Sequence, residues 1–93
     1  MLLVSYDISN DKVRTGFSKY LKKYGRRLQY SVYEIRNSQR VLKNILEEIK
    51  LRYKPKFTKT DSVVIIPICE TCKKRIIRFG HLVNEEKEVI FFE

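Results

Sequence analysis

The chain has 93 residues, and its 20 lysines and arginines outnumber its 11 aspartates and glutamates, for a formal net charge of +9. A chain of this length forms one domain with a modest core, and such domains often gain stability by pairing with a second copy. The charge favours a polyanionic partner, and nucleic acid is the first candidate. A membrane surface comes second, because the cations are spread from Lys12 to Lys87.

No apolar stretch approaches the roughly 20 residues needed to cross a bilayer. The short apolar run after Met1 lacks the preceding basic segment of a secretory leader. Two cysteines without export signals indicate reduced thiols. We therefore expect a small, soluble protein of the cytoplasm that has no membrane partner.

The N-terminal stretch predicts a buried strand over residues 2–6, because its side chains suit a pleated surface. Asp7 follows at the carboxyl end of that strand, where α/β sheets commonly place ligand chemistry. Ser9, Asn10 and Asp11 then offer helix-capping side chains. Asp7 therefore has two open interpretations. It is part of a ligand-binding site, or it helps to start the helix that follows.

Apolar side chains next recur at helical spacing and predict a helix that ends near Gly25, a residue suited to a left-handed C-cap. The buried stripe of this helix consists of Val13, Phe17, Tyr20, Leu21 and Tyr24. Residues 26–36 alternate as a strand does. We expect one long strand there, bent or interrupted near Glu34.

A second helix follows, capped by Asn37 or Ser38 and terminated by Pro55. Its buried face consists of Val41, Leu42, Ile45, Leu46, Ile49 and Tyr53. Residues 63–66 form an apolar, β-branched run that is too short for a buried helix. This run predicts a central strand beside the first one.

Beyond Pro67 the sequence predicts a turn or single helical turn at residues 69–74 and a short extended piece at residues 76–79. A last strand is expected at residues 88–92. A terminal strand this apolar would invite aggregation if it were exposed at a sheet edge. Pairing with another subunit would remove that hazard.

This order of elements predicts a two-layer α/β (α+β) sandwich in which helices cover one face of a sheet. Ferredoxin-like topology is the nearest common arrangement. That topology requires a further strand between the second strand and the second helix, and residues 26–36 leave little room for two strands.

Several standard catalytic sites are absent from the sequence. The three glycines are too widely separated for a phosphate-binding loop, and we interpret the single histidine, His81, as a surface residue. Cys69 and Cys72 have the spacing of metal ligands, but structural zinc requires four. A zinc site shared by two copies, a redox pair and unreactive reduced thiols all remain open, and we favour the last.

A magnesium ion is poorly held by one carboxylate, because Mg²⁺ seeks octahedral oxygen coordination and keeps several waters. Two copies of Asp7 at a dimer axis would hold it, with waters and a phosphate completing the shell. Such an ion can polarise a phosphodiester and activate water. The nearby Arg14 and Arg27 can contact phosphates in bidentate fashion.

Five segments in a fixed order resemble the CRISPR-associated protein 2 family. They are VSYDISND (residues 4–11), LKKYG (21–25), LQYSVYE (28–34), DSV (61–63) and IPICETC (66–72). The resemblance covers about residues 1–80. Each segment alone is a weak indication of the family, whereas the five segments in this order are specific for it.

The resemblance implies a ferredoxin-like fold and a homodimer formed through the sheets. It divides the chain into a core domain at residues 1–80 and a C-terminal segment at residues 81–93, whose strand completes the partner's sheet. It further implies CRISPR spacer acquisition in antiviral defence, with the dimer binding double-stranded protospacer DNA and bridging dimers of the integrase subunit, CRISPR-associated protein 1. Some members are described as magnesium-dependent endonucleases acting on single-stranded RNA or double-stranded DNA.

The resemblance also implies catalytic residues. Asp7 falls on the family's strand-end aspartate, the expected Mg²⁺ ligand, while Arg14 and Arg27 fall on its two arginines, with Arg26 competing for the second role. Tyr33 falls on an aromatic position that is commonly Phe, and its hydroxyl needs a partner if it is buried.

Two functions remain open at this point. One is a DNA-binding scaffold whose basic residues neutralise backbone phosphates without reading sequence. The other is a magnesium-dependent nuclease centred on Asp7. A toxin-like RNA nuclease is a more distant third.

Overall fold

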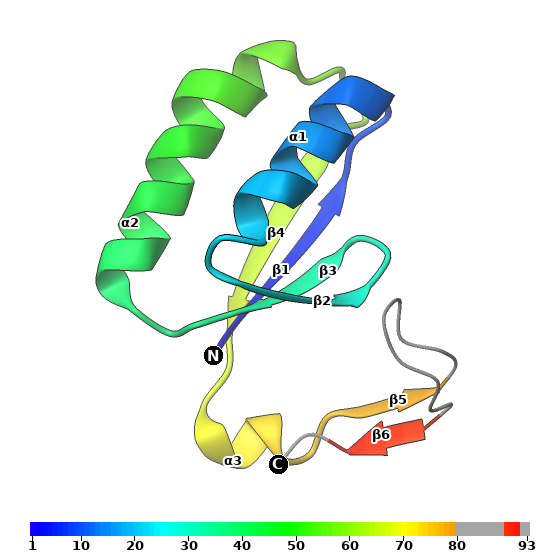
Figure 1. The fold of residues 1–93 in the computed structure, drawn as a ribbon, viewed down its shortest axis with the longest axis vertical. Coiled ribbons are helices and arrows are strands. Elements are labelled where there is room, and N and C mark those ends of the chain that lie inside the picture. Colours follow the sequence, from blue (N-terminus) through cyan, green and yellow to red (C-terminus); the bar gives the residue numbers. More distant parts are fainter. Residues whose placement is uncertain (80–88, 92–93) are drawn as a thin grey trace.

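The computed structural model describes residues 1–79 and 89–91 of the chain (Figure 1). In chain order the elements are β1 (Leu2–Asp7), α1 (Asp11–Leu21), β2 (Gly25–Gln29), β3 (Val32–Ile35), α2 (Gln39–Glu48), the π-helical turn η1 (Ile49–Tyr53), the 3-10 turn η2 (Lys54–Lys56), β4 (Ser62–Pro67), α3 (Glu70–Lys73), β5 (Ile77–Phe79) and β6 (Val89–Phe91). Within the described ranges, no helix is long and apolar enough to span a membrane.

The main sheet has four antiparallel strands in the order β2-β3-β1-β4. In its register, Leu3 of β1 lies opposite Glu34 on one side and Ile66 on the other. Helices α1 and α2 cover one face of this sheet (Figure 1). The two-layer α+β sandwich is therefore confirmed, and the βαββαβ order is that of a ferredoxin-like domain.

The core lies between the helices and this covered face. Alternate residues of β1, namely Leu2, Val4 and Tyr6, are buried there together with Phe17 of α1 and Ile45 of α2. The rings of Tyr6 and Phe17 meet edge to face with their centroids 5.2 Å apart. Because side chains alternate along a strand, the intervening residues of β1 point to the opposite, open face of the sheet.

The expectation of one long strand over residues 26–36 was wrong. Two strands, β2 and β3, occupy this stretch and are joined by a turn at Tyr30 and Ser31. A bulge between Arg27 and Gln29 shifts the register of the pair. A turn of two residues is the shortest common hairpin connection. The stretch therefore has room for the strand that ferredoxin-like topology requires.

Gly25 is not the C-cap of α1. The helix ends at Leu21 with Lys22 as its C-cap, in right-handed conformation. Gly25 instead opens β2 opposite Ile35, where a Cβ atom would lie 1.9 Å from the carbonyl oxygen of Glu34. The close approach of the β3 backbone thus requires glycine here.

The strand predicted at residues 63–66 does lie beside β1, but at the edge of the sheet rather than its centre. Val63 and Ile65 pack against the core. Val64 and Ile66 point to the open face, where they are 50% and 46% exposed. The unbroken apolar run therefore reflects one side of β4 that is covered by helices and one side that is left open by the residues the structure describes.

The elements expected after Pro67 are present. α3 forms the single helical turn, β5 the extended piece, and β6 lies within the predicted last strand. β5 pairs with β6 of the same chain, in a ribbon beyond the end of the main sheet (Figure 1). His81 lies outside the described residues. The addition of the last strand to a partner's sheet stays a prediction.

Candidate functional site

Asp7 ends β1 on the open face of the main sheet, opposite Ser62 of β4. Its side chain is exposed. An open depression of about 420 Å³ surrounds it, with Arg14, Tyr30 and Val64 in its lining. We call this hollow the Asp7 depression.

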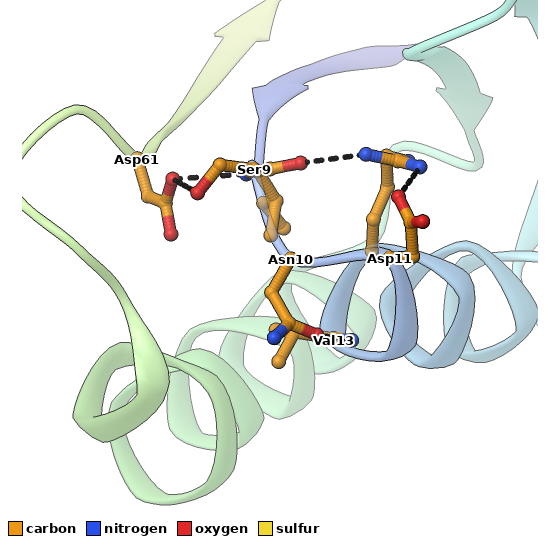
Figure 2. A network of polar contacts seen from close by, with 7 residues as sticks. Ser9, Asn10, Asp11, Val13 and Asp61 are labelled. Carbon is orange, nitrogen blue, oxygen red and sulfur yellow. Dashed lines mark hydrogen bonds and ion pairs between the residues drawn. The ribbon is translucent and has the colours of Figure 1, made fainter.

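The loop that follows Asp7 is fixed by Asp61, which precedes β4 (Figure 2). One oxygen of the Asp61 carboxylate accepts hydrogen bonds from the backbone N–H and the hydroxyl of Ser9, both at 3.0 Å. The other oxygen accepts the N–H of Thr58 at 2.9 Å. The backbone N–H groups of Thr58 and Ser9 lower the pKa of the Asp61 carboxyl. This network joins the end of β1 to the start of β4 and thereby holds the backbone that carries Asp7.

Helix α1 begins beside the same network (Figure 2). The side chain of Asn10 accepts the N–H of Val13 at 3.0 Å, which confirms one of the predicted caps. Arg14 donates to the carbonyl oxygen of Ile8 at 3.1 Å and forms an ion pair with Asp11. Arg14 is therefore anchored to the loop after Asp7, and both residues line the Asp7 depression.

Arg27 and Tyr33 lie on the helix-covered side of the sheet. The Tyr33 side chain is fully buried, and its hydroxyl lies 2.6 Å from Ser18 Oγ. Arg27 donates from Nε to the Tyr33 hydroxyl at 3.1 Å and from Nη2 to Ser18 Oγ at 2.6 Å. The structure therefore gives Tyr33 the partner its hydroxyl needs, and it makes Tyr33 a support for Arg27 rather than a side chain open to a substrate.

A second open depression, of about 310 Å³, lies between α1 and the β2–β3 hairpin. It is lined by four cationic side chains, those of Arg14, Lys19, Lys22 and Arg27. No carboxylate of the described residues lines it. We call it the basic depression. Tyr6, Arg14 and Tyr30 line both depressions, so the two hollows adjoin.

The sequence-based site did not include Ser18, Lys19, Lys22 or Tyr30. A signal for part of this set was present, because Arg14, Ser18 and Lys22 recur every four residues and so share one face of α1. Tyr30 carried no such signal, since its place at the tip of a hairpin follows from a turn that was not predicted.

A metal site within one chain is not formed by the described residues, among which no three His, Cys, Asp or Glu side chains are grouped to hold an ion. Asp7 supplies the carboxylate oxygens that Mg²⁺ prefers, and it is exposed at a strand end. An ion shared between the Asp7 carboxylates of two copies stays a prediction.

Cys69 and Cys72 are exposed free cysteines at the start of α3. Cys69 Sγ accepts the N–H of Cys72 at 3.4 Å, and this hydrogen bond lowers the pKa of the Cys69 thiol. The neighbouring Cys69 thiol raises the pKa of Cys72. The pair offers two sulfur ligands where structural zinc needs four.

Comparisons with known proteins agree on one family. A model of the family described as CRISPR associated protein Cas2 matches residues 1–76. A Rhodospirillum rubrum protein named CRISPR-associated endoribonuclease Cas2 4 is 34% identical over 83 residues, covering 89% of this chain and 64% of that protein. This chain therefore spans less than two thirds of that relative. A Methanospirillum hungatei protein named CRISPR-associated endoribonuclease Cas2 2 is 30% identical over 91 residues, covering 96% of each chain.

Among solved structures, Streptococcus pyogenes Cas2 at pH 6.5 matches with a TM-score of 0.72. The match covers 85% of this chain and 98% of that chain at 23% identity, and so it is a likeness of fold.

Proposed function

The chain belongs to the CRISPR associated protein Cas2 family, and from this premise we propose that it binds nucleic acid during CRISPR spacer acquisition in antiviral defence. The observation that carries the proposal is the basic depression, in which four cationic side chains meet and no carboxylate is present. Lysine and arginine side chains bind backbone phosphates without reading base sequence. The proposed ligand is double-stranded protospacer DNA, and the proposed protein partners are dimers of the integrase subunit, CRISPR-associated protein 1, in the cytoplasm.

The proposed working unit is a homodimer formed through the open face of the main sheet. Val64 and Ile66 leave apolar surface on that face. Packing two copies face to face would cover this surface and bring the two Asp7 carboxylates together. β4 also presents an edge, and edge strands accept an added strand. We propose that residues 81–93 of the partner supply it beside the core at residues 1–80, in place of the β5–β6 pairing.

A second candidate function is a magnesium-dependent endonuclease acting on single-stranded RNA or double-stranded DNA. It is favoured by the exposed Asp7 at the end of β1 and by the word endoribonuclease in the names of the two relatives. Two Asp7 carboxylates would hold Mg²⁺, which when bound polarises a phosphodiester and activates water. Arg14, anchored at Ile8, would hold a phosphate beside Asp7. Arg27, supported by Tyr33, would hold a neighbouring phosphate.

Paired assays with purified protein and in cells that carry the integrase subunit separate the two functions. Asp7→Ala should abolish magnesium-dependent cleavage by the pure protein while leaving DNA binding and spacer acquisition intact. The double variant Lys19→Gln/Lys22→Gln should weaken both DNA binding and spacer acquisition, because it removes two of the four cations of the basic depression.

The double variant Lys43→Gln/Lys50→Gln is the matched control. It removes the same charge from residues that line neither the basic depression nor the Asp7 depression. Spacer acquisition that is unchanged in the Lys19/Lys22 variant would contradict the binding function. Cleavage that persists in Asp7→Ala, or in the presence of EDTA, would contradict a magnesium-dependent nuclease site at Asp7, and the absence of cleavage by wild type would contradict the nuclease function.

A further inference from the structure

Tyr30 is the most exposed aromatic residue among those whose side chains the structure describes, at 81%. It occupies the first position of the turn between β2 and β3. Within the described part of the chain its ring makes no aromatic contact and its hydroxyl no hydrogen bond. The Tyr30 ring is exposed to solvent at the tip of the hairpin, so it contributes nothing to the hydrophobic core.

The backbone beneath the Tyr30 ring is nevertheless bonded to Tyr6. The N–H of Tyr6 donates to the carbonyl oxygen of Ser31 at 3.0 Å, and the Tyr6 hydroxyl donates to the carbonyl oxygen of Tyr30 at 3.4 Å. A tyrosine hydroxyl is protonated at neutral pH, so Tyr6 can act as the donor in this contact. Tyr6 directly precedes Asp7. The tip of the hairpin is thus tied to the strand end that carries the carboxylate, so a base that stacks on the ring has little backbone left to order.

The position of Tyr30 between the two depressions indicates what its ring can contact. Tyr30 lines the Asp7 depression on one side and the basic depression on the other. Arg14 also lines both, while Lys19 and Lys22 lie on the basic side. A single strand whose phosphates lie along these cations would pass the Tyr30 ring on its way to Asp7. Aromatic rings in such positions stack on unpaired bases, and they do so with every base because each has a π-face.

We propose that Tyr30 is a stacking platform for an unpaired nucleobase of a strand whose phosphates occupy the basic depression. The ligand class is single-stranded nucleic acid, including an unpaired end or overhang of a duplex. This inference rests on the proposed nucleic-acid binding, and it adds a base contact to a surface that otherwise offers phosphate contacts.

Binding of short labelled strands to the full chain tests the proposal. The probes are a single-stranded RNA, the matching single-stranded DNA, and an abasic strand of the same length and charge. Tyr30→Ala should weaken binding of both base-containing strands by about five- to a hundredfold and leave the abasic strand unchanged. Tyr30→Phe keeps the ring and should bind within about twofold of wild type, since stacking needs no hydroxyl.

Leu51→Ala is the matched control, because Leu51 is 79% exposed and lines neither depression. It should leave binding of all strands unchanged. A 2-aminopurine base within the strand provides a second readout, since stacking quenches its fluorescence. Wild type should quench it and Tyr30→Ala should not. Equal effects on RNA and DNA indicate recognition of the base alone, and a preference for either strand would identify that strand as the ligand.

The outcomes separate this inference from the function on which it rests. If the wild-type chain binds the abasic strand but Tyr30→Ala loses no affinity for base-containing strands, the stacking role is wrong and the phosphate-binding role stands. An equal loss on the abasic strand, or a changed oligomeric state in Tyr30→Ala, would also overturn the stacking role. If wild type binds none of the single strands but binds double-stranded DNA of the same length, the stacking role is wrong and the proposed function stands. If it binds neither the single strands nor the duplex, both are wrong.

Discussion

Arg27 donates from Nε to the hydroxyl of Tyr33 across 3.1 Å while its guanidinium carbon lies 5.6 Å from the centroid of the Tyr33 ring. The second partner of that hydroxyl is Ser18 Oγ, at 2.6 Å. One fully buried hydroxyl therefore fixes a cation of the basic depression to both β3 and α1. The stability of the core and the placement of this cation depend on the same atoms.

Tyr33→Phe should lower the free energy of unfolding by about 1–2 kcal/mol, because Arg27 Nε loses its hydrogen-bond partner and Ser18 Oγ keeps only the bond from Arg27 Nη2. Urea unfolding followed by circular dichroism measures the loss. Tyr53→Phe is the matched control, because the Tyr53 hydroxyl makes no hydrogen bond within the described residues and its removal should be nearly neutral. Equal stability losses in the two variants would contradict a special role for the Tyr33 hydroxyl.

Ser18→Ala removes the other end of the same hydrogen bond. Combined with Tyr33→Phe, it should cost less than the sum of the two single losses, because residues in one hydrogen-bond network do not act independently. Urea unfolding of the single and double variants completes the cycle. Strict additivity would show that the 2.6 Å contact between Ser18 and Tyr33 carries no coupling.

Sequence patterns predicted the parts of the fold that rest on periodic burial. The stripe containing Val13, Phe17 and Leu21 packs on the core as predicted, and Asp7 does lie at the carboxyl end of β1, where it is exposed. The hairpin at Tyr30 was missed because a turn of two residues scarcely interrupts the alternation of its flanking strands. The role of Gly25 was missed for a related reason, since a close backbone approach depends on the strand opposite and not on neighbours in the sequence.

The candidate site could be predicted only in part. Asp7 and Arg14 are close in the sequence, and they line the same depression because Arg14 lies in the first turns of the helix that follows. Lys19, Lys22 and Arg27 come together only once β2 is folded against α1. Arg27 was named from its ability to contact phosphates, and the resemblance to a family supplied Tyr33, but no pattern indicated that Tyr33 would be buried.

Gly16→Ala and Gly25→Ala should change stability in opposite directions. A Cβ at Gly16 would lie 3.9 Å from the Tyr53 hydroxyl, an ordinary contact in the middle of α1, so alanine should stabilise the protein by roughly 0.5–1 kcal/mol. A Cβ at Gly25 would overlap the carbonyl of Glu34, and the forced backbone shift should cost about 1–3 kcal/mol. Thermal unfolding measures both effects. A tolerated alanine at position 25 would contradict the close approach of β2 and β3.

Stability should fall in acid partly because of Glu34, whose carboxylate accepts hydrogen bonds from Lys73 and Arg26, each at 3.1 Å. Burial acts to raise the pKa of Glu34, but these two cations outweigh it and the pKa lies below the usual 4.5. A lowered folded-state pKa stabilises the protein above the unfolded-state value, and that contribution is lost as the pH falls through the folded-state value.

Glu34→Gln should therefore be less stable than wild type at pH 7, and the difference should shrink below a pH of about 4.5, the usual glutamate value. Urea unfolding from pH 7 to pH 3 measures the difference at each pH. Glu47→Gln, at an exposed position of α2, is the control and should show no such dependence. If the difference in free energy of unfolding between Glu34→Gln and wild type stayed constant with pH, the Glu34 charge would contribute no stability.

The salt dependence of nucleic-acid binding should reveal how many backbone phosphates bind in the basic depression. Removing one cation that neutralises a phosphate should reduce the slope of log K against log salt concentration by about 0.7 for a single strand and 0.9 for a duplex. Lys19→Gln and Lys22→Gln should each lower the slope by this amount, whereas Lys43→Gln on α2 changes the net charge equally and should not. Binding measured from 50 to 200 mM salt, concentrations at which counterion release dominates, gives the slopes. If Lys43→Gln lowered the slope as much as Lys19→Gln, the attraction would come from the net charge of +9 spread over the chain, and the basic depression would have no special part in it.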